Sequence, residues 1–287
     1  MKFESNKKEF QIQVLMMTFN HEKFIGRAIE SVIEQETSFS FQLVISVDKS
    51  EDNTLEICKN YQKKFPDKIK ILESDSNIGS QKNAVKILNY ANAKYIAICE
   101  GDDYWIDKFK LQKQVEFLEL NKDYSLCFHY TQEIYENGVN GKIYGKNGRR
   151  IDFNVSDTFS PIAIFHTSSI VFRRSAFQLT DWFSLVVSAD MALFSIVSAK
   201  GKLRCIPEIM SVYRKHEGGL TRTKAVIDNY HKNRIQLMNY LNEFHQFKYD
   251  KEAKKVIAFH QRAIEGIPEK VDLLTLLKQK IRKIIYK

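Results

Sequence analysis

Hydrophobic and polar residues alternate in regular blocks along the first hundred residues. Short apolar runs, typical of buried strands, are followed by stretches in which apolar residues recur every three or four positions, as on one face of a helix. The apolar runs predict strands at residues 12–18, 41–48, 69–72 and 95–99. The helical stretches lie at 23–35, between Asp52 and Pro66, and at 79–90. Strand–helix–strand units at this spacing favour right-handed crossovers and a mostly parallel sheet.

The pattern is less regular after residue 100. Strands are expected at 124–130, 170–172 and 203–206, and helices at 108–121 and 190–199. Asn-Gly pairs between residues 136 and 149 indicate hairpins or loops. From residue 223 the pattern is almost entirely helical. The chain is therefore predicted to be an α/β protein, with a three-layer α/β/α sandwich over residues 1–221 and a basic helical extension over residues 222–287.

The composition is that of an ordinary folded protein, but its charge is unevenly distributed. Hydrophobic residues make up 44% of the 287 positions and charged residues 28%, which excludes a disordered or low-complexity chain. Of the net charge of +9, a surplus of eight lies in residues 222–287, where 15 Lys and Arg face 7 Asp and Glu. A nucleic-acid-binding domain normally spreads positive charge over the surface that contacts the nucleic acid. The near-neutral remainder therefore gives no indication of a nucleic-acid partner.

The cysteines and the start of the chain bear on the cellular compartment. Cys58, Cys99, Cys127 and Cys205 lack both the paired spacing of a zinc site and the density of a disulfide-stabilised domain. The first ten residues are charged and do not resemble a secretory signal. The longest uncharged run, at 158–172, is too short to span a bilayer. We therefore expect a cytoplasmic protein in a reducing compartment.

Polar and acidic residues follow each of the first four predicted strands. They occupy residues 18–22, 48–52, 77–83 and 100–105. Ligands of open parallel sheets bind outside the carboxyl ends of the strands, where these four segments would converge. A single acidic residue at such a position is usually a helix cap or a solvated turn. Four polar segments at one rim indicate a binding site.

The segment Glu100-Gly101-Asp102-Asp103 places three carboxylates within four positions. Carboxylates this close raise one another's pKa unless a positive charge lies among them. Mg²⁺ or Mn²⁺ meets that need and often keeps further positions for phosphate oxygens. The sequence contains neither a Walker-type phosphate loop nor a dinucleotide-binding glycine motif. We therefore expect phosphates to bind through a metal ion, with Lys82 offsetting further charge.

Four segments in order carry a family resemblance. They are Thr18-Phe19-Asn20, residues 47–54, Asn77-x-Gly79, and Glu100-Gly101-Asp102-Asp103-Tyr104-Trp105. This set resembles the inverting family 2 glycosyltransferases with the GT-A fold, the bacterial polysaccharide type of sugar transferase. The resemblance covers about residues 10 to 220.

The resemblance implies a nucleotide-sugar site built from all four strand ends. Its residues would be Thr18, Phe19, Asn20, Glu22, Asp48, Asn77, Lys82, Glu100, Gly101 and Asp102. Asp48 would accept a hydrogen bond from a uracil-like base, and Lys82 would face the diphosphate. Asp102 would be the ligand of Mn²⁺ or Mg²⁺. His216, in a segment similar to the family's Tyr-Arg-x-His motif, would be a further metal contact.

The resemblance also implies a catalytic and an acceptor side. Asp190 would be the general base that deprotonates the acceptor, and Trp105, Ser168 and Ser169 would lie toward the acceptor. Judged from the residues alone, the more common interpretation of Asp190 is an aspartate that stabilises a helix N-terminus. In the same way Trp105 is equally a core residue, and His216 a structural histidine.

Several positions depart from the family pattern. Val47 and Glu100 each stand where the family has an aspartate, and Lys49 stands where a glycine is common. Ala189 stands where a glutamate or glycine is often found. None of these changes removes a group that the chemistry requires. The Gln-x-x-Arg-Trp motif of processive synthases is absent from the sequence, which implies transfer of one sugar per encounter.

The resemblance thus implies a hexosyltransferase-type enzyme. It would move one sugar, with inversion, from a nucleoside-diphosphate donor to a glycan or lipid-linked acceptor in cell-surface polysaccharide synthesis, with UDP as the first candidate nucleotide. A nucleotidyltransferase is an alternative, although its usual Gly-rich phosphate loop is missing. A non-catalytic basic binding module is another, although it leaves the acidic rim unexplained.

The C-terminal segment 271–287 raises a separate hypothesis. Leu274, Leu277, Ile281 and Ile284 recur at helical spacing among lysines and arginines. Such a helix suits the anionic inner face of a membrane, beside a lipid-linked acceptor. It equally suits packing on the body of the protein or on another protomer.

Overall fold

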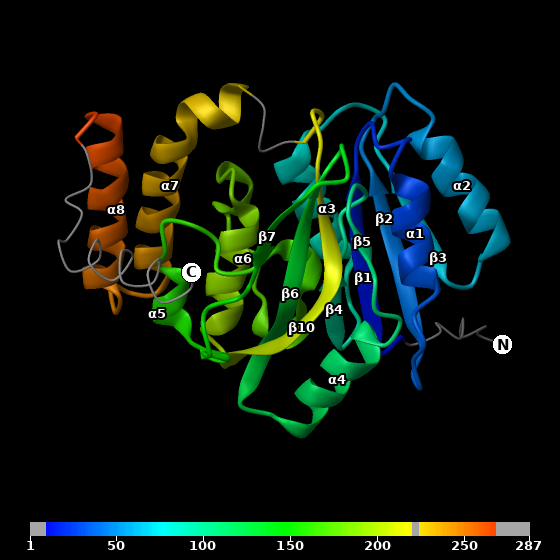
Figure 1. The fold of residues 1–287 in the computed structure, drawn as a ribbon, viewed down its shortest axis with the longest axis horizontal. Helices are drawn as coiled ribbons and strands as arrows, with labels where there is room; N and C mark the ends of the chain where they lie inside the picture. Colours follow the sequence, from blue (N-terminus) through cyan, green and yellow to red (C-terminus); the bar gives the residue numbers. More distant parts are fainter. Residues whose placement is uncertain (1–9, 220–223, 268–287) are drawn as a thin grey trace, which may run out of the picture.

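The computed structural model describes residues 10–219 and 224–267. At its centre lies a mixed ten-stranded sheet in the order β3-β2-β1-β4-β9-β6-β10-β5, with β7 paired to β6 and β8 to β10. Helices cover both faces of this sheet (Figure 1). The predicted three-layer α/β/α architecture is confirmed.

The first half of the fold follows the sequence pattern closely. Its elements are β1 (Ile12–Thr18), α1 (Ile25–Ile33), β2 (Phe41–Val47), α2 (Thr54–Lys64), β3 (Ile69–Glu73), α3 (Ser80–Tyr90) and β4 (Tyr95–Ile98). β1 pairs in parallel with both β2 and β4, and β2 pairs in parallel with β3. Three strand–helix–strand units therefore place four carboxyl ends along one edge.

The second half departs from a parallel sheet. It contains β5 (Tyr104–Trp105), α4 (Lys110–Leu120), β6 (Tyr124–Tyr135), β7 (Asn140–Tyr144), β8 (Asp152–Phe153), α5 (Val155–Thr158), β9 (Val171–Arg173), α6 (Ala189–Ser198) and β10 (Lys202–Lys215). β9 lies antiparallel between β4 and β6, and β7 forms a hairpin with β6. The expected parallel pairing is confirmed for β1 to β4, whereas the sheet is mixed beyond β4, because β9 runs antiparallel to both of its neighbours.

The last strand is much longer than the expected strand at 203–206. β10 pairs in parallel with β6, and the register shifts between Ile206 and Ile209. Pro207 lies in that interval, where a residue without an N–H cannot contribute to a regular ladder. The irregularity lets the strand continue to Lys215, so that the residues after it reach the rim of the sheet.

Two hydrophobic clusters lie on opposite faces of the sheet. Leu15 joins one cluster, with α3 and α6, whereas Val14 and Met16 join the other, with α1, α2 and α4. Because successive side chains of a strand point to opposite faces, an uninterrupted apolar run such as β1 supplies both clusters. All four cysteines are buried and unpaired.

The helices α7 (Lys224–Phe244) and α8 (Asp250–Ile264) follow the sheet domain. Leu237 and Leu241 of α7 and Val256 of α8 join the α3–α6 cluster. Trp182 stacks on Tyr240 with ring centroids 5.2 Å apart. The helical pattern expected after residue 223 is confirmed for the described part. The expected boundary between residues 221 and 222 stays a prediction, and the cationic segment 271–287 lies outside the described residues.

None of the helices described here combines the length and apolar character required to cross a membrane.

Candidate active site

Two loops at the carboxyl edge are joined by reciprocal hydrogen bonds. The backbone N–H of Asn20 donates to Ser50 Oγ at 3.1 Å, and Asn20 Oδ1 accepts from the N–H of Glu51 at 2.9 Å. Glu22 Oε2 accepts from the backbone N–H of Asn53 at 3.1 Å. Asn20 adopts φ 53°, a left-handed conformation that asparagine tolerates better than most residues. The loops after β1 and β2 therefore form one continuous rim.

Asp48 connects this rim to the loop before α3. Asp48 is 2% exposed; its Oδ1 accepts from the N–H groups of Lys49 and Ile78, and its Oδ2 accepts from the N–H of Gly79, each at 2.9 Å. Gly79 has φ 82°, which favours glycine. Each carboxylate oxygen can accept two hydrogen bonds, so Asp48 keeps capacity for a ligand while holding the Asn77–Gly79 loop.

The segment after β4 places its carboxylates in a buried setting. Burial, followed by the negative charges of Asp102 and Asp190, raises the pKa of Glu100 to about 8. Asp103 is fully buried, and burial with the charges of Asp102 and Glu100 holds its pKa well above the usual range. Two of the three carboxyls therefore favour the neutral form in the protein alone, as the sequence spacing indicates.

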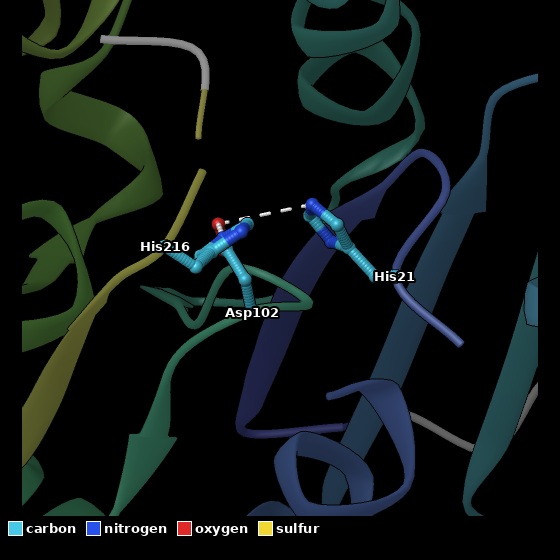
Figure 2. Close-up of side chains that lie close together, drawn as sticks. All are labelled: His21, Asp102 and His216. Carbon is cyan, nitrogen blue, oxygen red and sulfur yellow. Dashed lines mark hydrogen bonds and ion pairs between the residues drawn. The ribbon is translucent and has the colours of Figure 1, made fainter. Parts of the chain in front are cut away.

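Asp102 differs because two histidines face it (Figure 2). Its Oδ2 lies 3.0 Å from His216 Nε2 and 3.7 Å from His21 Nε2. Burial opposes ionisation, but the hydrogen bond from His216 and the proximity of both imidazoles outweigh it and lower the pKa of Asp102. Burial in turn lowers the pKa of His21, against the attraction of Asp102. One carboxylate and two imidazoles are a suitable donor set for a divalent cation.

Arg214, near the end of β10, anchors the acidic segment. Its backbone N–H donates to Asp103 Oδ1 at 3.2 Å, and its Nη1 donates to the Asp102 carbonyl at 3.1 Å. The guanidinium also lies 4.5 Å from the centroid of the Tyr104 ring. These contacts use the carbonyl of Asp102 and leave its Oδ2 directed toward the histidines.

The donor atoms of the site fit a metal ion. Within the described residues, ligand atoms of His21, Asp102 and His216 form one group and those of Glu100, Asp103 and His166 a second, each spanning no more than 4.8 Å. Asp103 Oδ2, Thr18 Oγ1 and His21 Nδ1 are buried and make no hydrogen bond to any residue in the described part of the chain. Asp102 and His216, the two expected metal ligands, are brought together in the first group.

Comparison with known proteins assigns the family. The sequence profile described as Glycosyl transferase family 2 matches residues 13–180, more than half of the chain. The chain belongs to glycosyl transferase family 2. An uncharacterized protein of Mycobacterium tuberculosis (strain H37Rv) is 32% identical over 209 residues, which cover 73% of this chain and 60% of the relative. This chain thus spans less than two thirds of that relative's length.

Solved structures share the fold. The structure of S. aureus TarS 1–349 in complex with UDP-GlcNAc has a TM-score of 0.65 at 16% identity, covering 92% of this chain and 76% of that one. Mannosyltransferase PcManGT from Pyrobaculum calidifontis, in complex with GDP-Man and Mn²⁺, has a TM-score of 0.59 at 15% identity, covering 98% and 82%. The expected GT-A fold is confirmed. Family membership favours the glycosyltransferase interpretation over the nucleotidyltransferase and binding-module alternatives.

Asp190, the expected general base of this family 2 chain, lies in the first turn of α6 and is half-buried. Its charge contributes to the raised pKa of Glu100, which places Asp190 within electrostatic range of the acidic segment. The structure thus brings a helix from the second half of the chain to the rim formed by the first half. Whether Asp190 accepts a proton stays a prediction.

The remaining expected site residues divide by exposure. Phe19 is 39% exposed and Lys82 is exposed in the first turn of α3. Trp105, Ser168 and Ser169 are buried, and Trp105 Nε1 donates to the Ser168 carbonyl at 2.9 Å. Because all three residues are buried, their contact with an acceptor stays a prediction.

Sequence reasoning did not assign a role to His21. It appeared only as one of several polar residues after β1, without a characteristic spacing to Asp102 or His216. The available signal was positional, because β1 and β4 are adjacent parallel strands and the residues that follow them must meet at one edge.

Proposed function

We propose that this protein is a metal-dependent, inverting glycosyltransferase. It transfers one sugar from a nucleoside-diphosphate donor, UDP-linked in the first instance, to a glycan or lipid-linked acceptor in cell-surface polysaccharide synthesis. The observation that carries the proposal is the Asp102 carboxylate facing two imidazoles at the carboxyl edge of a family 2 sheet. This is a site for a cation and for the phosphates that the cation binds.

The donor half of the proposal rests on the rim after β1, β2 and β4. Asp48 keeps free acceptor capacity at the base of this rim, and the exposed ring of Phe19 offers a flat surface beside it. TarS with UDP-GlcNAc supports UDP as the first candidate, and PcManGT with GDP-Man makes GDP the second. At identities near 15% these proteins support the type of donor and leave the sugar open.

The transfer step would use residues from both halves of the chain. Asp102 and His216 would hold a cation, whose positive charge would stabilise the departing diphosphate. Lys82 adds a second positive charge from α3. Asp190 accepts the proton of the acceptor hydroxyl as its oxygen attacks the anomeric carbon from the face opposite the diphosphate, which inverts the configuration. General-base assistance of this kind contributes roughly 10²–10⁴-fold to the rate.

The experiment is a panel of UDP-, GDP- and dTDP-sugars, each with Mn²⁺ or Mg²⁺, scored for release of the nucleoside diphosphate. We expect a UDP-sugar to be the best donor and Asp102→Asn to abolish release. Asp190→Asn should bind the donor within ~3-fold of the wild type while turnover falls by about 10²–10⁴-fold. If none of the nucleotide sugars yields a free nucleoside diphosphate, the proposed function is wrong. Wild-type turnover by Asp190→Asn would overturn the assignment of the base.

Association with an anionic membrane through residues 271–287 belongs to the same proposal. It rests on the helical spacing of apolar residues among the basic ones. Sedimentation with anionic vesicles, before and after deletion of residues 270–287, tests it. Equal binding by both forms contradicts the membrane role of this segment.

A further inference from the structure

His21 lies across Asp102 from His216, and the transfer step proposed above assigns it no role, since only Asp102 and His216 hold the cation there. Both imidazoles direct Nε2 toward the same carboxylate oxygen, Asp102 Oδ2, at 3.7 Å and 3.0 Å (Figure 2). The two rings are 6.1 Å apart between centroids and nearly perpendicular. The three side chains come from the loop after β1, the loop after β4 and the residue after β10.

The spacing of these atoms matches that of ligands around one cation. The three ligand atoms lie within 4.8 Å of one another. Imidazole nitrogens and carboxylate oxygens bind first-row metals at about 2.0–2.2 Å, so two ligands of one ion lie roughly 3–4 Å apart. The side chains therefore need only small adjustments to bind a common ion. The side chains of His21 and Asp102 are partly accessible, at 15% and 18%, whereas His216 is buried.

The surroundings of His21 fix the ring in this position. Its backbone N–H donates to Thr54 Oγ1 at 2.8 Å, which holds the loop independently of the ring. On the far side of the ring, Nδ1 faces Gly101, as does Thr18 Oγ1. A Cβ on Gly101 would lie 3.0 Å from the first atom and 2.8 Å from the second. The His21 imidazole can occupy this position because Gly101 has no side chain.

The two atoms beside Gly101 also suit a metal-bound histidine. Neither His21 Nδ1 nor Thr18 Oγ1 has a hydrogen-bond partner among the residues that the structure describes. A histidine that binds a metal through Nε2 normally donates its Nδ1–H to a neighbouring acceptor, which fixes the tautomer. The buried hydroxyl of Thr18 is available for that role.

The second group of candidate ligands is less suitable. His166 Nδ1, its nearest imidazole atom to Asp103, is already 2.9 Å from Ser168 Oγ. Asp103 is fully buried, and its other oxygen accepts from the backbone of Arg214. A cation there would have to compete with Ser168 for His166 Nδ1, beside an Asp103 side chain that is 1% exposed. At Asp102, whose side chain is 18% exposed, a cation would replace one hydrogen bond, that between His216 Nε2 and Asp102 Oδ2.

We propose that His21 is a third protein ligand of the cation, so that the site binds a first-row transition metal in preference to Mg²⁺. The inference rests on the proposed function only in placing the cation at Asp102. Two imidazoles and one carboxylate suit transition metals, whereas Mg²⁺ favours oxygen ligands and retains its water. Three protein ligands also leave open coordination positions for the oxygens of a diphosphate.

The test measures binding of Mn²⁺ without a nucleotide. Electron paramagnetic resonance follows the loss of free Mn²⁺ signal for the wild type, His21→Asn, His21→Gln and the matched control His166→Asn. We expect both His21 variants to bind Mn²⁺ at least ~10-fold more weakly, since even the loss of an outer partner of a metal ligand costs about that much. The control should bind as the wild type does. In competition, Mg²⁺ should displace Mn²⁺ from the His21 variants at a ratio of Mg²⁺ to Mn²⁺ about tenfold lower than the ratio that the wild type requires.

A direct measurement on the wild type removes any dependence on how the variants fold. Pulsed resonance of bound Mn²⁺, with ¹⁵N-labelled histidine, should detect two coupled imidazoles, and one in His21→Asn. A single coupled imidazole in the wild type, or unchanged affinity in both variants, overturns the inference. These outcomes leave the proposed function standing if nucleotide release still requires Asp102. Failure of nucleotide release with an intact two-histidine signal would instead overturn the function alone.

Discussion

Gly101→Ala adds one methyl group at a crowded point of the rim. The new Cβ would lie 2.8 Å from Thr18 Cβ, 2.8 Å from Thr18 Oγ1 and 3.0 Å from His21 Nδ1. Ordinary contacts between such atoms are about 3.5–4.0 Å, so the neighbours must move by roughly 0.5–1 Å. Thr18 is 2% exposed, and its carbonyl accepts from the N–H of Asp48 at 3.0 Å. It cannot move without disturbing the end of β1.

The cost follows from this crowding. Overpacking a filled site typically destabilises a protein by about 1–3 kcal/mol. Replacing glycine also lowers the conformational entropy of the unfolded chain, which stabilises the folded protein by roughly 0.4–1 kcal/mol where the backbone conformation suits alanine. We therefore expect the free energy of unfolding to fall by about 1–2 kcal/mol and Tm by about 3–6 °C. Displacement of His21 and Asp102 by a fraction of an ångström should lower kcat/KM by ~10–100-fold.

The matched control is Gly26→Ala, in the first turn of α1. Its Cβ would have Tyr61 as nearest neighbour, at 3.6 Å, an ordinary contact. Alanine is the better helix former by about 0.8–1 kcal/mol, so this variant should be slightly more stable and equally active. Urea unfolding and nucleotide release are measured for both. Wild-type stability and turnover in Gly101→Ala would refute the claim that close packing at Gly101 positions the site.

Three further predictions concern single charged or titratable groups. Lys82→Met should weaken binding of UDP by ~10-fold, about 1.4 kcal/mol, and Lys82→Arg should restore it. If calorimetry finds that Lys82→Met binds UDP as tightly as the wild type does, Lys82 is not part of the diphosphate site. Burial lowers the pKa of His245 to about 4, and its Nε2 lies 2.9 Å from Ser195 Oγ. Between pH 6.5 and 4 the unfolded chain therefore binds more protons than the folded one. The free energy of unfolding should fall by ~1–2 kcal/mol as the pH drops through that window. In urea unfolding, His245→Gln should make the free energy of unfolding depend less on pH. Burial also lowers the pKa of Lys110 to about 7, and its Nζ has no hydrogen-bond partner in the described part of the chain. Lys110→Met should raise the free energy of unfolding at pH 7 by about 1–3 kcal/mol, and a loss of that size would show that the contact with Trp105 outweighs burial of the amine.

The first half of the fold could be predicted from the sequence because its signals are local. β1 was expected at residues 12–18 and lies at Ile12–Thr18, and the helix expected to end before Pro66 ends at Lys64. The side-chain period and the helix-stopping proline are properties of a few neighbouring residues. The polar segments after β1, β2 and β4 could be placed at one edge because consecutive parallel strands share a direction.

The second half could not be predicted to the same extent. The two-residue strands β5 and β8 are too short to have a periodic signal, and β10 continues well beyond the expected strand. Burial of apolar surface does not specify a direction, so the apolar run at 170–172 gave no indication that β9 is antiparallel to β4 and β6. Strand direction depends on how the whole chain packs.

The order of residues is enough to show which side chains are available for chemistry: Asp102 in an acidic segment after a buried strand, and His216 in a segment similar to a family motif. The tertiary structure alone decided that these two residues, 114 positions apart, meet at 3.0 Å and that His21 faces them. The types of residue at a site follow from the chemistry of their side chains. Their distances follow from strand order and register, which the packing of both faces of the sheet sets together.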